Sequence, residues 1–228
     1  MSTYNGSTFS APAQVTSLGG VERVAAVKQS GGAIGLVIEK GIYPAGNPFN
    51  TELFWTRNAG VGWSDSVQLT SYADRDAQPT LVDLGSNNVG LILSRWVAYD
   101  AAGNVLPDKN DPNYSYTGTE LYQMTYTAAT DTWSAAVNIT NTPLISEAYP
   151  SLAKGPSGTL YLFYSSNEGG SWSIVGRRYQ SGAWTAGSVL ESGLMEQYLQ
   201  QPSIINDVPG KYRLVYAQKK ACPNPLCP

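Results

Sequence analysis

Two carboxylates occupy the same place in a repeated phrase and are the first candidates for chemistry. Asp76 stands three residues before Pro79, and Glu147 stands three residues before Pro150. A pair of Asp or Glu side chains is sufficient to hydrolyse a glycosidic bond, with one acting as acid and the other as base or nucleophile. A repeated position is also what a structural repeat produces. We therefore expect no enzyme here, because no complete catalytic set surrounds the pair.

Aromatic and amide side chains accompany these carboxylates. Such side chains suit sugar rings and protein surfaces equally well when they are exposed. The residues predicted to bind a ligand are Tyr72, Arg75, Asp76, Trp96, Tyr99, Glu147, Tyr149 and Tyr198. Further candidates on the same face are Tyr43, Tyr114, Tyr116, Gln197 and Gln200. The alternative is that these side chains pack the connecting segments against the strands.

One segment is rich in oxygen ligands. Asp100, Asp108 and Asp111 lie within it and could bind calcium, which prefers six to eight oxygen ligands. Their spacing differs from that of an Asp-x-Asp-x-Asp-Gly loop, and Asp is favoured in turns in any case. Otherwise no cofactor is predicted.

The absence of histidine and the scarcity of cysteine restrict the chemistry further. With no histidine in the chain, Ser-His-Asp and Cys-His catalysis and His-ligated metal sites are excluded. Cys222 and Cys227 are predicted to form a small disulfide, which would imply an oxidising compartment. Half of a zinc site and two free thiols are the alternatives, although zinc would need two further ligands.

Composition favours an all-β domain without nucleic-acid or membrane partners. Of the 228 residues 14% are charged, and the net charge of −3 includes no block of like charge. Nucleic-acid binding would need clustered Lys and Arg. No run of 18 apolar residues could span a membrane, and no signal peptide is visible. We expect an extracellular or cell-surface protein whose partner is a carbohydrate or a protein surface.

The elements that must position these residues are β-strands arranged in a repeat. A phrase beginning with an aromatic residue and a Ser or Thr starts at Phe9, Trp63, Trp133 and Trp184, a spacing of roughly 50 to 70 residues. Its tryptophans are expected to pack between neighbouring units. A second phrase contains Pro79, Pro150 and Pro202, and its counterpart at 21–27 lacks the proline. Apolar alternating runs follow these four segments at 33–39, 89–95, 159–164 and 211–217. A third run occupies 52–56, 120–127 and 173–179.

Four antiparallel strands per unit predict a β-propeller. We expect four blades, with blade 1 at about 18–71, blade 2 at about 72–141, blade 3 at about 142–192, and blade 4 split between 193–228 and 1–17. Joining the ends in one blade would remove exposed sheet edges. The alternative is a segment of a larger propeller.

Residues 149–184 carry a resemblance to a known family. They begin Tyr149-Pro-Ser-Leu, continue through Leu-Tyr-Leu-Phe-Tyr164 and end Gly-Ala-Trp184. This pattern resembles the repeat of bacterial extracellular sialidase-like β-propellers of the Asp-box type. Ser165-Ser-Asn-Glu-Gly-Gly-Ser-Trp172 resembles the Asp-box itself, Ser-x-Asp-x-Gly-x-Thr-Trp, with Asn for Asp and Ser for Thr. The segment falls between the second and third strands, whereas the sialidase box lies between the third and fourth.

What the resemblance implies is a fold, because an Asp-box is a structural turn. A sialidase-like site would also need a tyrosine nucleophile, for which Tyr149 or Tyr198 is the candidate. It would need three arginines that clamp a carboxylate. Arg23 and Arg75 lie at suitable junctions, but the later units offer no third.

The long connections all fall on one face, at 40–51, 96–119, 165–171 and from 219 onward. Long irregular segments in a compact domain are usually functional or disordered. We therefore predict a non-catalytic, lectin-like or adhesive binding propeller that uses this face, as a monomer or within an assembly. The first alternative is a structural subunit of a larger surface protein, and the second is a sialidase-like glycoside hydrolase.

Overall fold

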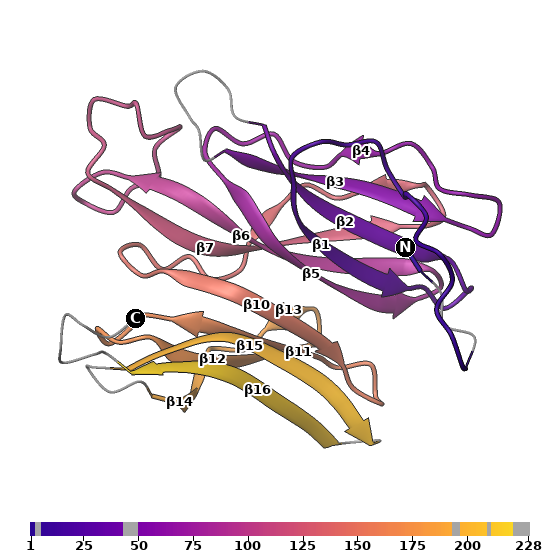
Figure 1. Cartoon of the computed structure of the whole chain (residues 1–228). Helices are drawn as coiled ribbons and strands as arrows, with labels where there is room; N and C mark the ends of the chain where they lie inside the picture. Colours follow the sequence, from indigo (N-terminus) through magenta and orange to yellow (C-terminus); the bar gives the residue numbers. More distant parts are fainter. Residues whose placement is uncertain (3–5, 43–49, 193–196, 209–210, 221–228) are drawn as a thin grey trace.

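The structure is a computed structural model that describes residues 1–2, 6–42, 50–192, 197–208 and 211–220. In this part of the chain it is all-β, with no helix, and thus with no helix able to cross a membrane. The strands form antiparallel sheets in which successive strands are neighbours (Figure 1). The prediction of an all-β chain built from successive antiparallel strands is confirmed.

Three sheets contain four or five strands each, and one contains two. The first sheet consists of β1 (Val21–Lys28), β2 (Ile34–Gly41), β3 (Thr51–Asn58) and β4 (Val67–Gln68). The second consists of β5 (Asp76–Gly85), β6 (Asn88–Tyr99), β7 (Tyr116–Thr127), β8 (Thr132–Trp133) and β9 (Val137–Asn138). The third consists of β10 (Glu147–Lys154), β11 (Leu160–Ser166), β12 (Ser173–Gln180), β13 (Ala183–Trp184) and β14 (Ser188–Glu191). The last pairs β15 (Gln197–Val208) with β16 (Lys211–Lys220).

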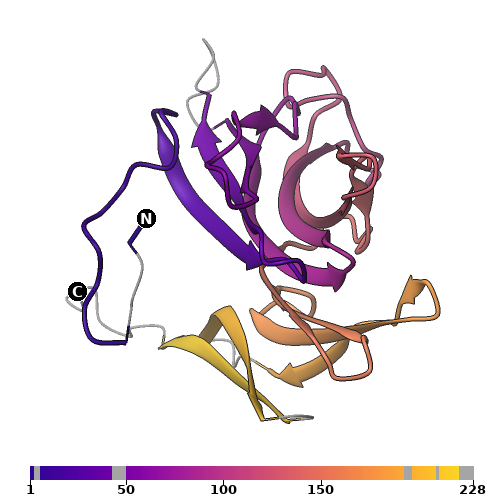
Figure 2. The same ribbon diagram turned by 90° about the vertical axis from the view of Figure 1, so that its right-hand side faces the viewer.

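The first strand of each sheet lies beside the first strand of the next. β1 contacts β5, β5 contacts β10, and β10 contacts β15. In Figure 2 the sheets stand side by side in chain order, and no sheet closes on itself. This arrangement is of the β-propeller type, and it brings four first strands together.

The cores lie between adjacent sheets, where alternating apolar residues of the strands meet. Leu53, Leu91 and Leu93 are fully buried between the first and second sheets, with Trp133 packed against their cluster. Leu121 and Leu162 are fully buried between the second and third, with Trp184 packed against theirs. The expectation that Trp133 and Trp184 pack between units is confirmed.

The first strands share an irregularity at the repeated proline. Gln78, Tyr149 and Gln201 each precede the proline and have φ values of 55°, 56° and 55°. The pairing register shifts at the same place in all three strands. A left-handed conformation is unfavourable for residues other than glycine, so neighbouring groups must hold it. The proline thus lies at a bulge inside the strand, where its missing N–H costs no ladder bond.

Backbone N–H groups of the bulges bond to the preceding sheet. The Gln78 N–H donates to Glu39 Oε2 at 2.8 Å, and the Tyr149 N–H donates to Gln78 Oε1 at 2.7 Å. Just after the bulges, the Leu152 N–H donates to Thr80 Oγ1 at 3.3 Å. The first two bonds fix the bulges of β5 and β10 to the preceding sheet and keep Gln78 and Tyr149 in their left-handed conformation.

The connection between β6 and β7 is shorter than predicted. Residues 96–119 were expected to be irregular, but β6 continues to Tyr99 and β7 begins at Tyr116, with these two residues paired. Val97, Ala98 and Tyr99 are buried, so the apolar side chains extend the hairpin beyond the predicted end. The irregular part is limited to residues 100–115.

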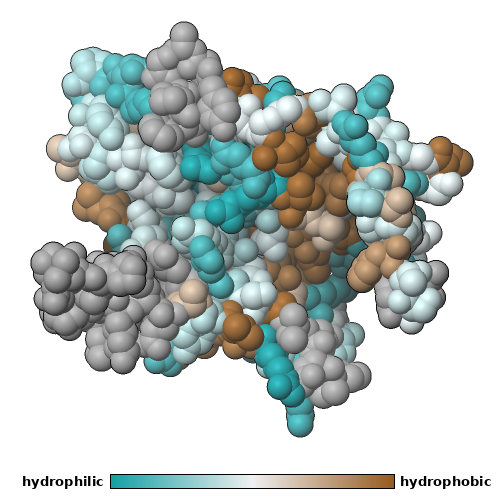
Figure 3. All heavy atoms as spheres, in the orientation of Figure 1, coloured by the Kyte–Doolittle hydropathy of each residue, from teal (hydrophilic) through white to brown (hydrophobic). Residues whose placement is uncertain are grey.

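β1 is the most exposed of the long strands in the first three sheets. Val21 and Val24 are 43% and 55% exposed. The space-filling view in Figure 3 shows hydrophobic surface on the side of the molecule where β1 lies, next to a hydrophilic area.

Candidate functional site

The four bulged or irregular first strands enclose a hollow of about 370 Å³. Each strand contributes two consecutive residues to its lining. The lining residues are Arg23 and Val24, Gln78 and Pro79, Tyr149 and Pro150, and Gln201 and Pro202. Residues far apart in the sequence but equivalent in the repeat therefore converge on one place.

A buried carboxylate with two arginines lies next to this hollow. Glu39 is fully buried, and its carboxylate accepts a hydrogen bond from Arg75 Nη2 at 2.8 Å. Arg23 Nε lies 3.7 Å from the same carboxylate, and its side chain is 50% exposed. Arg75 also contacts Glu22 at 3.1 Å. Arg23 is consequently the cation that an incoming anionic ligand would meet first.

Trp96 extends this group of residues outward. Its ring is 38% exposed, and the Arg75 guanidinium lies 5.6 Å from the ring centre. A cation held above an indole face is a stable arrangement that also leaves part of the ring open. Of the predicted ligand-binding residues, Tyr149 lines the hollow, whereas Arg75 is connected to it through Glu39, and Trp96 through Arg75.

Asp76 forms a separate, buried ion pair with Arg95, and Tyr72 packs against that arginine. Asp76 is fully buried and accepts two hydrogen bonds of 2.7 Å from Arg95. The Arg95 guanidinium also lies 4.4 Å from the centre of the Tyr72 ring. Burial raises the pKa of Tyr72 to about 12, so its hydroxyl stays protonated at neutral pH. Neither residue lines the hollow.

Glu147 is buried as well, and it faces the second sheet. Its carboxyl accepts a hydrogen bond from the Thr142 hydroxyl, while Oε2 has no hydrogen-bond partner among the described residues. Burial, and to a lesser degree the nearby charge of Glu120, raises the pKa of Glu147 to about 8. Glu147 is therefore mainly protonated at neutral pH. It too is outside the lining of the hollow.

Tyr99 lies in the core, so the prediction that it stands in an exposed connection is wrong. It is 1% exposed, its hydroxyl donates to Glu120 Oε1 at 2.8 Å, and its ring stacks on Tyr116. Burial and the bonded carboxylate raise the pKa of the Tyr99 hydroxyl. Tyr198 lies on β15, opposite Lys219 in the pairing with β16. Tyr43, Cys222 and Cys227 lie outside the described residues.

The three aspartates predicted to bind calcium each hold a local turn. Asp100 accepts hydrogen bonds from the Ala102 and Asn104 N–H groups. Bonds from Asn104, above all from its side chain, lower the pKa of Asp100. Asp108 and Asp111 accept bonds from the N–H groups two residues further on. Among the described residues no three acidic, His or Cys side chains are grouped as metal ligands would be.

The segment that resembles an Asp-box joins β11 to β12. Asn167 Oδ1 accepts a hydrogen bond from the Ser146 N–H at 2.7 Å, which ties this turn to the start of β10. Gly169 and Gly170 have positive φ values of 93° and 86°, as a tight turn of this kind requires. The segment has a structural role as a turn.

Sequence reasoning missed Glu39, Gln78, Arg95 and Gln201. The pairs Gln78-Pro79, Tyr149-Pro150 and Gln201-Pro202 were a visible signal, since one position of a repeated phrase must face one place in the fold. No comparable signal marked Glu39 or Arg95. Each lies on the second strand of its sheet, and only the register shows what it contacts.

Several solved structures share this fold. An ulvan lyase bound to a -[GlcA(1-4)Rha3S]- ligand superimposes with a TM-score of 0.56 at 12% identity, over 86% of this chain and 52% of that one. The xylan β-1,4-xylosidase of Bacillus halodurans C-125 gives 0.57 at 15% identity, over 90% and 38%. A Trypanosoma rangeli sialidase mutant with trans-sialidase activity gives 0.59 at 12% identity, over 93% and 36%. The chain thus spans about half or less of these proteins.

No protein-family model matches the sequence, and no curated protein is similar to it in sequence. At identities of 12–15% the structural likeness shows a fold, and it transfers no residue. It supports the predicted resemblance to sialidase-like propellers at the level of the fold.

The comparison corrects the predicted function. A non-catalytic binding propeller was expected, but these structural neighbours are a lyase, a sialidase and a xylosidase. They do not support the non-catalytic prediction, and the second alternative, a sialidase-like glycoside hydrolase, is closer to them.

Proposed function

We propose that this chain forms the substrate-binding part of a carbohydrate-active enzyme of the glycosidase type, and that the hollow between the first strands holds an acidic sugar. The observation that carries the proposal is the convergence of Arg23 and Tyr149 at one hollow, with the buried carboxylate of Glu39, held by Arg75, beside Arg23. Left-handed residues in three strands form the lining. Backbone conformations of this kind cluster at functional sites.

An acidic sugar fits the charges of the hollow. The lining contains the Arg23 guanidinium and no carboxylate. A guanidinium binds a carboxylate or sulfate through parallel hydrogen bonds, which gives both orientation and affinity. Two of the structural neighbours were solved with acidic sugars: the ulvan lyase with its GlcA-containing ligand, and a T. rangeli sialidase with a difluorinated nononic acid.

Tyr149 is the candidate nucleophile. Tyr149 is one of the lining residues, whereas Asp76 is locked in an ion pair and Glu147 faces the second sheet. A tyrosine needs a nearby carboxylate to act on a sugar. Glu39 is tied to the lining through the Gln78 N–H, and it could take that role only on release from Arg75, which holds it as Arg95 holds Asp76.

The number of blades belongs to the same proposal. The first strands of all four sheets line one hollow. This is evidence for four sheets arranged around one axis, with β15 and β16 as the fourth sheet. The extracellular location and the Cys222–Cys227 disulfide remain predictions.

The test is a cleavage assay with oligosaccharides that contain glucuronic or sialic acid, and with neutral xylo- and arabino-oligosaccharides beside them. New reducing ends report hydrolysis, and an absorbing unsaturated product reports elimination. We expect hydrolysis of an acidic substrate, a loss of at least about 100-fold in kcat for Tyr149→Phe, and a KM raised about tenfold for Arg23→Gln.

The matched control is Lys28→Gln, which removes an exposed cation from the far end of β1 and should leave kcat and KM unchanged. Full activity of Tyr149→Phe would remove Tyr149 from the mechanism. Failure of the wild-type chain both to bind and to cleave every acidic substrate would overturn the proposal.

A further inference from the structure

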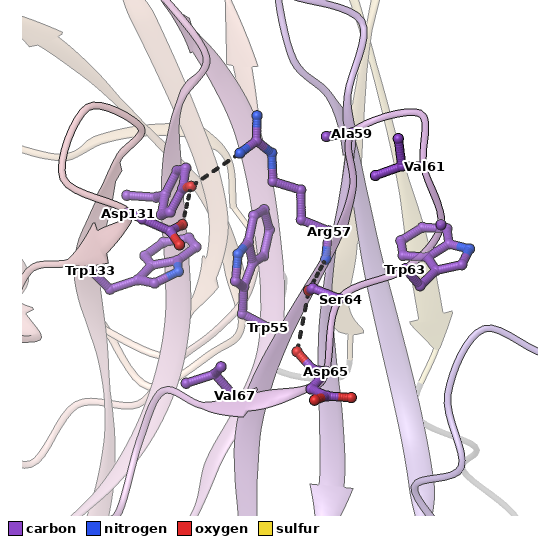
Figure 4. Close-up of a pocket in the computed structure, with 12 residues that line it drawn as sticks. Trp55, Arg57, Ala59, Val61, Trp63, Ser64, Asp65, Val67, Asp131 and Trp133 are labelled. Atoms are coloured by element: carbon purple, nitrogen blue, oxygen red, sulfur yellow. Dashed lines mark hydrogen bonds between the residues drawn. The ribbon is translucent and has the colours of Figure 1, made fainter.

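We propose that a second pocket, at the turns between β3 and β4 and between β7 and β8, binds a neutral sugar ring. The pocket has a volume of about 510 Å³. It shares no lining residue with the hollow between the first strands. Its principal lining residues are Trp55, Arg57, Trp63, Tyr126, Asp131 and Trp133. Figure 4 shows the three tryptophans ranged across the pocket, with Trp63 on one side and Trp133 on the other.

Three of the rings form a rigid wall, of which only Trp133 is partly exposed; Trp55 and Tyr126 are buried, at 6% and 1% exposed, and Trp133 packs against them. The centre of the Trp55 ring lies 5.1 Å from that of Trp133 and 5.4 Å from that of Tyr126. The space for the Trp55 ring depends on Gly35, because a Cβ on that residue would come within 2.0 Å of the indole. A fixed aromatic surface suits the apolar face of a sugar ring, since little conformational freedom is lost on binding.

Polar groups beside this wall match the hydroxyl groups of a sugar. The Tyr126 hydroxyl donates to Asp131 Oδ1 at 2.6 Å, and Arg57 Nη1 lies 3.4 Å from the same hydroxyl. Arg57 Nε donates to Gln29 Oε1 at 2.8 Å, which fixes the guanidinium. Ligand sites typically combine such apolar walls with a few placed polar groups. With Asp65 and Asp131 opposing Arg57, the pocket favours an uncharged sugar over an acidic one.

The neighbouring junction shows that this pocket departs from the repeat. Between the second and third sheets, Trp184 Nε1 donates to Gln123 Oε1 at 2.7 Å. Glu52 on β3 and Glu120 on β7 occupy equivalent positions in the repeat. Trp55 follows Glu52 by three residues, and Gln123 follows Glu120 by three, so Trp55 occupies the place of Gln123. Trp133 corresponds to Trp184, but its buried Nε1 has no acceptor among the described residues.

A tryptophan at position 55 therefore removes a hydrogen bond that the repeat provides and adds a buried aromatic ring against which Trp133 packs. The rim is apolar as well, since Val61 is 98% exposed and Val67 is 59% exposed. Isolated exposed valines are ordinary, but here both border one aromatic pocket. A sugar ring seated on the wall would cover them.

The test is a titration of the whole chain with neutral xylo-, manno- and cello-oligosaccharides, followed by tryptophan fluorescence and calorimetry. We expect millimolar or tighter binding by the wild type. Trp63→Ala and Asp131→Ala should each weaken it at least tenfold, and Trp63→Phe should restore most of it. The matched control is Trp172→Ala, which removes a tryptophan from the turn before β12 and should leave the affinity unchanged.

Two comparisons keep this site separate from the proposed enzyme site. Arg23→Gln and Tyr149→Phe should leave the affinity for neutral sugars unchanged, whatever their effect on acidic substrates. Thermal unfolding of each variant shows whether it is folded, and Asp131→Asn replaces any variant that is not. The proposal fails if no neutral oligosaccharide binds at millimolar concentration, or if Trp172→Ala weakens binding as much as Trp63→Ala does.

Discussion

The starts of β5 and β10 place an acidic residue at the same position in two different electrostatic settings. Asp76 begins β5 and lies near Glu52 of the first sheet, and Glu147 begins β10 and lies near Glu120 of the second. All four side chains are at most 3% exposed. We call the places where β5 meets the first sheet and where β10 meets the second sheet the two junctions. Each junction buries two carboxyl groups close together, which costs free energy unless one is paired or protonated.

The glutamates are held in the same way at both junctions. Glu52 accepts hydrogen bonds from the Thr70 hydroxyl at 2.5 Å and from the Tyr72 N–H at 2.7 Å. Glu120 accepts bonds from the Thr140 hydroxyl at 2.6 Å and from the Thr142 N–H at 2.9 Å. This shared arrangement ties the third strand of a sheet to the segment that leaves it.

The two junctions differ in the residue opposite the acid. In the strand pairing, Asp76 lies opposite Arg95, whereas Glu147 lies opposite Ser166. Arg95 forms a double hydrogen bond with Asp76. The serine supplies no charge, and burial raises the pKa of Glu147 to about 8. The residue opposite the acid, arginine in one sheet and serine in the other, thus distinguishes an ion-paired carboxylate from a neutral carboxyl group. A carboxyl group at a repeated position therefore need not have a repeated role.

The largest effect is expected when the cation that pairs with Asp76 is removed. Arg95→Met leaves Asp76 buried beside Glu52 with no counter-charge. We expect a loss of about 3–5 kcal/mol in the free energy of unfolding, the usual cost of breaking a buried pair. Denaturant unfolding at pH 7 measures it.

Arg178→Met is the control for that variant, since Arg178 is an exposed arginine on β12. Its effect should stay within about 0.5 kcal/mol. A loss below about 1 kcal/mol for Arg95→Met would show that Asp76 takes up a proton at little cost, and the two junctions would then be alike.

The strands that carry these residues were largely predictable, but the contacts between them were not. Alternating apolar residues marked the second and third strands, and tryptophans marked the packing between units. The bulge was hidden, because a residue before proline ordinarily prefers an extended conformation, and Gln78 and Tyr149 are left-handed instead. Their conformation depends on bonds to the preceding sheet, which no local pattern records.

The errors in the predicted site have the same cause, because contacts between strands leave no local pattern in the sequence. Trp96 and Tyr99 were assigned to an irregular connection because aspartate, asparagine and glycine follow them closely. The β6–β7 pairing extends as far as Tyr99, which buries its ring. That Arg95 pairs with Asp76 follows from the register of β5 against β6, which the bulge at Gln78 shifts.

Glu147→Gln tests the protonation of the second junction. A carboxyl group whose pKa is higher in the folded chain than in the unfolded chain stabilises the fold while it is protonated. This contribution is complete below about pH 4.5 and is lost as the pH rises to about 8. Within that window wild-type stability should fall by about 1.4 kcal/mol per pH unit on account of Glu147.

The glutamine variant lacks this loss, so at pH 7 we expect it to exceed the wild type by about 3 kcal/mol. A shallower slope should remain below pH 7, because burial also raises the pKa of Glu52 to about 7. Denaturant unfolding from pH 5 to pH 9 measures both slopes, with the exposed Glu168→Gln as control. Parallel curves for Glu147→Gln and the wild type would contradict the assignment.

The smallest expected effect tests what the two junctions share. Thr70→Val and Thr140→Val each remove the hydroxyl that donates to a buried glutamate and accepts the N–H of Leu53 or Leu121. We expect each to lower the free energy of unfolding by about 1–2 kcal/mol at pH 7, since a buried carboxyl oxygen and a backbone N–H lose one partner. The exposed Thr132→Val is the control.

Because the hydrogen-bond lengths at Thr70 and Thr140 differ by only 0.1 Å, the two losses should agree within about 0.5 kcal/mol. Agreement would mean that the two hydroxyl groups stabilise their glutamates equally, whatever charge lies opposite the acid. A much larger loss for Thr140→Val would mean that this hydroxyl also stabilises Glu147, so that the absence of an arginine there is offset by hydrogen bonds.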